Sequence, residues 1–201
     1  MIRTFKQQEV EDLAKYGSIP IINGLTDYAH PCQVLADLMT IRERKGSLEG
    51  LNFCYEGAAY DMANSLIVGC LTMGMKVAIA CPKGFEPAQD VLDFAVGYGE
   101  KFHLTNNVYE AADEADVVYT DVWASMGQES EAITRRKAFA GYQVNEDVMK
   151  VAAHDAMVLH CLPAHRGEEI TAEVIEKHGE IYDQAENRLH AQKAVLVTLM
   201  K

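Results

Sequence analysis

Short apolar runs alternate with amphipathic stretches along most of the chain, and this alternation predicts its secondary structure. The runs favour β-branched and aromatic side chains, whereas the stretches between them place apolar side chains at helical spacing. We expect strands at residues 51–55, 76–80, 101–104, 116–120, 156–160 and 180–183. We expect helices at residues 61–73, 87–98, 108–115, 129–140, 146–153 and 171–178. Strands separated by helices of this length predict an α/β fold with a doubly wound parallel sheet and helices on both faces.

Local signals agree with several of these boundaries. Asn145, followed by two acidic residues, and Thr171 have the side chains of helix N-caps. Pro87 fits the first turn of a helix, where its missing N–H costs nothing. Gly74 suits a left-handed helix stop.

Two further helices stand outside the alternation, at residues 30–44 and about 186–200. Both are more apolar than a lone surface helix, so we expect them to pack on each other and on something more. The segment before residue 24 resembles the tail of another unit. We therefore divide the chain into a first part at 1–44, an α/β domain at 45–185 and a closing helix at 186–201.

Composition narrows the possible functions. The 201 residues carry a net charge of −12, which repels a phosphate backbone and argues against nucleic-acid binding. The five cysteines form no C-x-x-C pair and are odd in number, so neither a zinc ribbon nor a disulfide framework is expected. Free thiols, no apolar signal core and no stretch that could span a bilayer predict a cytoplasmic protein with no membrane partner.

Polar side chains follow the predicted strands at their carboxyl ends. Asp61 lies in the turn after the first strand, Asp121 follows the fourth and Cys161 follows the fifth. The closing helix begins with Glu186-Asn187-Arg188. Ligands of open parallel sheets bind at this edge. A gathering of carboxylates, a thiol, imidazoles and an arginine suits a small zwitterionic ligand better than a hydrophobic one.

Each of these residues also has an ordinary structural interpretation. Asp121 could cap a helix, His160 could be a core histidine, Cys161 a small buried hydrophobe, and Arg188 could pair with a neighbouring acid. The glycine-bearing turn after the first strand could bind a dinucleotide. However, Gly-x-Gly-x-x-Gly is absent, and no acid follows the second strand to hold a ribose.

Four motifs in the right order change this interpretation. They are His30-Pro31-Cys32-Gln33, Asp121-x-x-x-Ser125-Met126-Gly127, His160-Cys161-Leu162-Pro163 and Glu186-Asn187-Arg188. Together they resemble the signatures of the ornithine carbamoyltransferases, within the aspartate/ornithine carbamoyltransferase family. The resemblance extends from near Ile2 to Lys201.

The resemblance implies a reaction. In this family an uncharged side-chain amine of ornithine attacks the carbonyl carbon of carbamoyl phosphate, phosphate leaves, and citrulline forms. The protein must bind a dianion, polarise a carbonyl and present an amine as its free base. These are electrostatic and positioning tasks, so no metal and no other cofactor is expected, and the partners are these two small molecules.

The resemblance also implies roles for particular residues. Cys161, His30 and Arg188 would be catalytic, the thiol acting as a positioning and proton-handling group. The residues expected to contact carbamoyl phosphate are Arg3, His30, Gln33 and Arg188. The residues expected to bind ornithine are Asp121, Ser125, Met126, Leu162 and Asp61.

Two departures from the family pattern affect these expectations. The Ser-x-Arg-Thr-Arg phosphate loop of the first domain does not occur in this sequence. Tyr60 and Asp61 stand where the family usually has an asparagine pair, and an ionised Asp61 would repel a carboxylate. We therefore expect a chain that lacks the first part of its enzyme and is inactive alone.

The same reasoning predicts a partner. Without a complete first domain, the apolar faces of the two outlying helices would be partly bare, which favours a homo-oligomer or a complex with a missing N-terminal fragment. A second possible function is a non-catalytic amino-acid-binding or regulatory remnant of the family. A third, a nucleotide-binding oxidoreductase, is disfavoured by the motifs.

Overall fold

A parallel sheet forms the centre of the protein. The computed structural model describes residues 1–124 and 132–200. The sheet order is β5-β4-β3-β6-β7, and every neighbouring pair is parallel. Its strands are β3 (Asn52–Glu56), β4 (Lys76–Ala80), β5 (Phe102–Thr105), β6 (Val117–Thr120) and β7 (Met157–His160). Five of the six expected strands are thus confirmed to within a residue or two.

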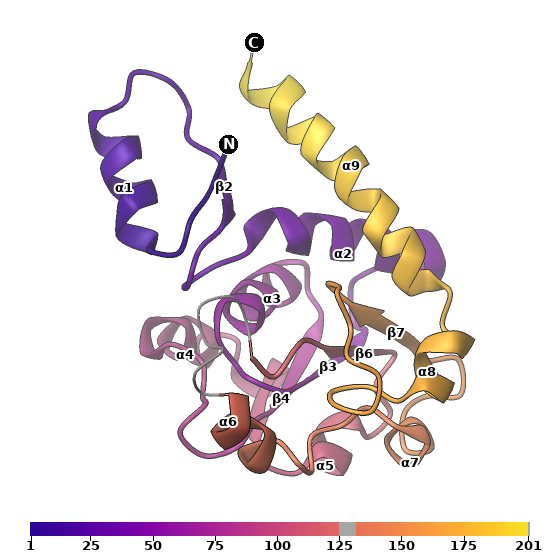
Figure 1. Ribbon diagram of the computed structural model, residues 1–201. Helices are drawn as coiled ribbons and strands as arrows, with labels where there is room; N and C mark the ends of the chain where they lie inside the picture. Colours follow the sequence, from indigo (N-terminus) through magenta and orange to yellow (C-terminus); the bar gives the residue numbers. More distant parts are fainter. Residues whose placement is uncertain (125–131, 201) are drawn as a thin grey trace.

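Helices cover both faces of this sheet, as the doubly wound prediction requires (Figure 1). Alternate strand residues divide between two cores, so that Phe53 and Tyr55 face one side while Cys54 faces the other. The first core also takes side chains from α2 (Pro31–Lys45), α3 (Asp61–Thr72) and α4 (Gln89–Val96). The second takes side chains from α5 (Val108–Ala112), α7 (Glu146–Met149) and α8 (Ala172–Lys177). The remaining helices on this body are α6 (Ala132–Ala138) and the 3₁₀ turn η1 (Gly99–Lys101).

The N-terminal segment forms a small unit of its own. β1 (Ile2–Arg3) and β2 (Asn23–Leu25) pair in parallel, with α1 (Gln7–Tyr16) between them. Figure 1 shows this unit set off from the main sheet and joined to it through α2. Arg3 therefore reaches the body of the protein from a separate two-stranded sheet.

The predicted strand at residues 180–183 is wrong, because α9 (Glu180–Leu199) already begins there. β7 is an edge strand, and its outward N–H groups still need acceptors. The Val158 N–H donates to Glu180 Oε1 and the His160 N–H donates to Gln184 Oε1, each at 2.9 Å. Four helical residues rise about 6 Å and two strand residues about 6.6 Å, so the spacings match. The helix takes the place of a sixth strand.

The predicted helix boundaries were partly right. Asn145 accepts from the N–H groups of Asp147 and Val148, and Thr171 accepts from Val174, so both caps are confirmed. Gly74, at φ +85°, follows α3 as expected. Pro87 was misplaced, since α4 begins two residues later. α7 is one turn rather than the eight residues predicted, and residues 129–131 of the predicted helix at 129–140 lie outside the described part.

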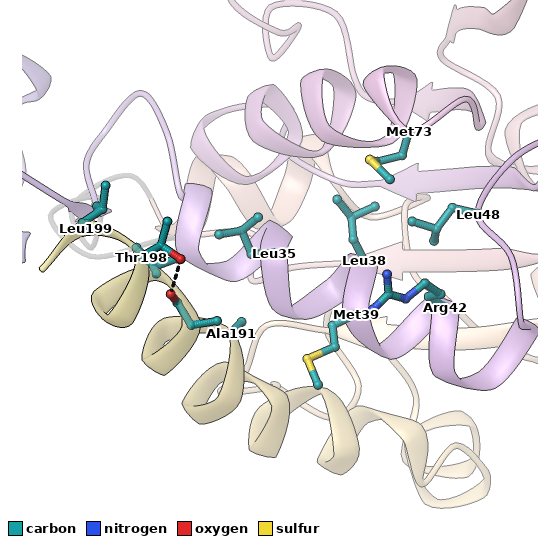
Figure 2. Close-up of a pocket in the computed structure, with 11 residues that line it drawn as sticks. Leu35, Leu38, Met39, Arg42, Leu48, Met73, Ala191, Thr198 and Leu199 are labelled. Atoms are coloured by element: carbon teal, nitrogen blue, oxygen red, sulfur yellow. Dashed lines mark hydrogen bonds between the residues drawn. The ribbon is translucent and has the colours of Figure 1, made fainter. Parts of the chain in front are cut away.

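The two outlying helices pack on each other, and α2 also packs on α3. Gly69 of α3 makes the second contact possible, because a Cβ there would collide with the Val34 side chain. An apolar groove of about 530 Å³ is lined by side chains of α2 and α9, together with Leu48 and Met73. Figure 2 shows Leu35, Leu38 and Met39 on one wall and Leu199 on the other. Leu35 is 45% exposed and Leu199 is 42% exposed, so these apolar faces are partly bare, as expected.

No helix within residues 1–124 and 132–200 is long and apolar enough to cross a membrane.

Glu56, the last residue of β3, carries a buried acid into the core. Its side chain is fully buried, and Oε2 has no hydrogen-bond partner among the described residues. Burial raises the pKa of this carboxyl to about 8, against a weaker opposing effect of the Cys54 thiol. From the ordinary carboxyl value up to about pH 8, the unfolded state therefore releases a proton that the folded state keeps. The free energy of unfolding falls as the pH rises through this range.

We predict that the unfolding free energy of Glu56→Gln falls less steeply with rising pH than that of the wild type. The difference in unfolding free energy between variant and wild type should grow by up to about 1.4 kcal/mol per pH unit below pH 8 and then level off. Urea unfolding at a series of pH values measures it. Glu100→Gln, on the surface, is the matched control. A difference that does not change with pH would contradict the assignment.

Candidate functional site

A pocket of about 220 Å³ opens at the carboxyl ends of β3, β6 and β7. This is the edge where the chain reverses its direction of strand addition, between β3 and β6, and where ligands of such sheets bind. Arg3, His30 and Arg188 reach it from β1, from the start of α2 and from α9. The remaining expected residues that line it are Asp61, Asp121, Cys161 and Leu162. Seven expected site residues thus meet in one place.

Asp121 and Cys161 form a direct pair on one wall. The Cys161 thiol donates to Asp121 Oδ1 at 2.9 Å, and the Val122 N–H donates to the same oxygen at 2.7 Å. Burial raises the pKa of the Cys161 thiol well above its usual value, and the Asp121 charge adds to this. The sulfur is therefore a protonated donor. Asp121 Oδ2 accepts nothing from the described residues, so it can receive an ammonium group.

The Leu162 backbone beside this pair is held in an unusual conformation. Its φ is +54°, in the left-handed region that a branched side chain rarely adopts. Its N–H donates to His160 Nδ1 at 2.9 Å, and His160 Nε2 faces buried Glu169 Oε1 at 3.2 Å. The histidine ring therefore positions the loop, and the Leu162 carbonyl accepts no hydrogen bond from the described residues. That carbonyl can accept one from an amine.

His30 is nearly buried at the N-cap of α2. Burial, together with the charges of Arg188 and Arg3, lowers its pKa to about 3. Its imidazole is thus neutral near neutral pH, with one N–H and one acceptor nitrogen. Nδ1 has no partner among the described residues. A neutral imidazole beside two guanidinium groups can polarise a carbonyl without adding charge.

Gln33 lies behind this cationic group rather than in the pocket lining. It is 1% exposed, and its Oε1 accepts from Arg188 Nη1 at 2.9 Å. Its Nε2 donates to Asp37 Oδ1 at 2.8 Å. In this arrangement Gln33 orients Arg188, and its expected direct contact with carbamoyl phosphate stays a prediction.

Asp61 brings a second carboxylate to the pocket. It is the first residue of α3, and burial raises the pKa of its carboxyl to about 7, with the Asp121 charge adding to the effect. Tyr60, just before it, packs elsewhere: its ring lies 5.1 Å from the Arg135 guanidinium carbon and, in a tilted arrangement, 6.2 Å from the Phe85 ring. Only the second residue of this pair therefore faces the ligand space.

The other expected residues have different outcomes. Ser125 and Met126 lie outside the described residues. Asp37, Gln184 and Glu169 are polar, almost completely buried and adjacent to the site, and sequence reasoning missed all three. Asp37 carried a signal, since an acid four residues after Gln33 lies on the same helix face. Gln184 could not be identified as a site residue, because it follows residues 180–183, which were predicted to form a strand.

Two groups could in principle offer ligands to a metal ion. Asp121, His160 and Cys161 have candidate ligand atoms within 4.8 Å of one another, and so have His165, Glu168 and Glu169. In the first group the Cys161 thiol is bonded to Asp121, and His160 Nδ1 accepts from Leu162. These bonds already use the ligand atoms, so the expectation of no metal stays unchanged as a prediction.

The charges in the pocket are divided between two sides. Guanidinium groups on one side suit phosphate oxygens, and carboxylates and a thiol on the other suit an amine. A neutral imidazole lies with the guanidinium groups. The arrangement can bring an anion and an amine together without a nucleophilic side chain, as a transfer between two substrates requires.

Comparison with family models identifies this arrangement. Residues 49–199 match the aspartate/ornithine carbamoyltransferase Asp/Orn binding domain, and residues 1–43 match the carbamoyl-P binding domain of the same family. The chain belongs to the aspartate/ornithine carbamoyltransferase family. The first match ends within the last turn of α2, and the second begins at residue 49.

Individual members of the aspartate/ornithine carbamoyltransferase family agree. The ornithine carbamoyltransferase of Carboxydothermus hydrogenoformans is 53% identical over the whole chain, and the anabolic enzyme of Pyrococcus furiosus is 50% identical. The solved ornithine carbamoyltransferase from Pyrococcus furiosus superimposes with a TM-score of 0.92 over 98% of the chain. The chain spans 66% and 65% of the length of the two curated relatives and 65% of the solved one.

Proposed function

We propose that this chain forms part of an ornithine carbamoyltransferase, which transfers the carbamoyl group of carbamoyl phosphate to L-ornithine and gives L-citrulline and phosphate. The observation that carries the proposal is the pocket in which Arg3, His30 and Arg188 face the Asp121–Cys161 pair. The relatives that cover the whole chain, at 50–53% identity, carry the name of this activity.

The geometry supports a separate role for each side of the pocket. Arg3 and Arg188 attract the phosphate dianion, and His30 donates its N–H to the carbonyl oxygen as negative charge develops there. Asp121 Oδ2 receives the α-ammonium of ornithine. The Leu162 carbonyl and the Cys161 thiol direct the uncharged side-chain amine at the carbonyl carbon. When the tetrahedral intermediate collapses, the bond between the carbonyl carbon and the phosphate oxygen breaks, and phosphate leaves toward the guanidinium groups with the proton that the attacking amine gives up.

A non-catalytic amino-acid-binding or regulatory role is the second candidate. The observation that favours it is the absence of a Ser-x-Arg-Thr-Arg run from these 201 residues. Losing several charge-assisted contacts, each worth roughly 1.5–3 kcal/mol, would leave carbamoyl phosphate weakly held. We therefore propose that the chain forms little or no citrulline alone.

We predict that citrulline formation by the purified chain does not exceed that of a Cys161→Ala, Asp121→Ala double variant. The measurement is citrulline produced from carbamoyl phosphate and ornithine. Addition of a polypeptide that carries the rest of a carbamoyl-P binding domain should then restore activity to the wild-type chain only. Restoration favours the enzyme. Ornithine binding without restoration favours the binding module. Activity of the chain alone would overturn the proposed role of the absent loop.

We predict that Asp61→Asn raises the affinity for ornithine, because an amide can donate to a carboxylate and an ionised acid repels it. Asp61 loses its proton near pH 7, so the gain should be small at lower pH and reach about tenfold above pH 8. Calorimetric titration of ornithine across this range tests it, with the exposed Asp113→Asn variant as control. Equal affinities of wild type and variant at every pH would exclude Asp61 from carboxylate recognition.

We further propose that another polypeptide surface covers the groove between α2 and α9, in a homo-oligomer or in a complex that supplies the rest of the first domain. Leu35, Leu199 and their neighbours form an apolar surface that water would otherwise cover. Light scattering at micromolar concentration should give a mass above that of one chain, and Leu35→Glu should lower it. A monodisperse monomer would count against self-association, and co-purification with the first-domain polypeptide would then decide between the two forms.

A further inference from the structure

A fully buried carboxylate lies beneath the pocket, at the meeting point of three elements. Asp37 of α2 has no solvent exposure. Gln33 of the same helix donates its Nε2 hydrogen to Asp37 Oδ1 at 2.8 Å, and Gln184 of α9 donates its Nε2 hydrogen to the same oxygen at 2.6 Å. Tyr119 of β6 joins the group, since Gln184 Nε2 also lies 3.2 Å from its hydroxyl. One carboxylate oxygen thus anchors two amides.

The first amide leads to the cationic side of the pocket. An amide that donates from Nε2 must present Oε1 in the opposite direction. Gln33 Oε1 accordingly accepts from Arg188 Nη1 at 2.9 Å. The carboxylate therefore decides which way Gln33 faces, and Gln33 in turn holds the guanidinium group of Arg188 in the pocket.

The second amide leads to the thiol side. Gln184 Oε1 accepts the His160 N–H at 2.9 Å, for the same reason of amide geometry. His160 is the residue before Cys161, and its ring accepts the Leu162 N–H. The carboxylate therefore also controls the backbone from which Cys161 and Leu162 reach the pocket.

We propose that Asp37 is a positioning residue that couples the two halves of the site, setting Arg188 through Gln33 and the Cys161–Leu162 loop through Gln184. This role rests on the proposed function, since it assigns each half a substrate. Asp37 touches neither ligand space, because it does not line the pocket. It acts through the orientation of two amides.

A purely stabilising role explains these contacts less well. An apolar side chain would fill the same space without the cost of burying a carboxylate, and within residues 1–124 and 132–200 Asp37 Oδ2 has no hydrogen-bond partner. Burial raises the pKa of Asp37 to about 7, opposed by the hydrogen bonds from Gln33, Gln184 and Tyr119 and by the Arg188 charge. Oδ1 remains an acceptor in both protonation states. The arrangement is costly for packing and serves orientation.

Single substitutions in this hydrogen-bond network test its two branches separately, the branch through Gln33 and the branch through Gln184. Gln33→Leu removes only the branch to Arg188, and Gln184→Leu removes only the branch to His160. Asp37→Ser removes both, because its short hydroxyl cannot reach two amides and leaves room for water. Asp37→Asn is the conservative variant, since its Oδ1 can still accept from both. Circular dichroism establishes that each variant is folded.

Two nuclear magnetic resonance signals report the two halves in the protein without ligand. The Arg188 Nε–H shift reports the first, and hydrogen exchange of the His160 backbone N–H reports the second. Gln33→Leu should move the Arg188 signal alone. Gln184→Leu should speed exchange at His160 about tenfold, as loss of one hydrogen bond predicts, and leave Arg188 unchanged.

Asp37→Ser should change both reporters, and Asp37→Asn should return both close to wild type. A folded Asp37→Ser protein that changes one reporter, or neither, would overturn the proposal. If the serine variant does not fold, Asp37→Asn decides alone, because coupling requires that it move both signals or neither. Neither reporter needs substrate, so this test can fail while the citrulline assay succeeds, and the reverse.

Discussion

The outward edge of β7 is the constraint on which the rest of the structure depends. A parallel sheet that ends at β7 leaves two N–H groups facing away from β6, and these groups cannot stay buried without acceptors. Glu180 and Gln184 supply the acceptors from α9. They are four residues apart in the helix, and the rise of four helical residues matches the distance between the two N–H groups on the strand. This match fixes both the position of α9 along the sheet and its rotation about its own axis.

The rotation of α9 also determines where its other polar side chains lie. Once Gln184 faces β7, Asn187 faces α2, where its amide donates to Thr40 and Glu43. Arg188 comes one turn after Gln184 and so turns to the carboxyl edge of the sheet, beside His30. Hydrogen bonds at the edge of the sheet thus determine where Arg188 lies in the pocket. The thiol side follows from the same strand, because Cys161 is the residue after β7.

Much of this could be predicted from the sequence, for identifiable reasons. The strands at Lys76–Ala80 and Val117–Thr120 are short, apolar and bounded by turns, so local pattern defines them. The gathering of Asp61, Asp121 and Cys161 followed from the rule that parallel strands end at one edge. The start of α9 could not be predicted, because the β-branched Ile181 and the aromatic Tyr182 favour a strand, whereas the segment is helical and supplies acceptors to a distant sheet edge. Gln184, the second amide partner of Asp37, lies 147 residues away in the sequence, beyond any local pattern.

That separation also has a consequence for how the protein is made. α2 leaves the ribosome well over a hundred residues before α9, so Asp37 and the apolar face around it must wait for their cover. Closing so long a loop adds little entropic cost beyond that of a shorter one, but the contact cannot form before α9 has been synthesised. During that interval the nascent chain presents a carboxylate and a bare helix face to whatever surrounds it. Until α9 has been synthesised, the pocket lacks Arg188, and the Asp37 carboxylate lacks one of its two amide partners.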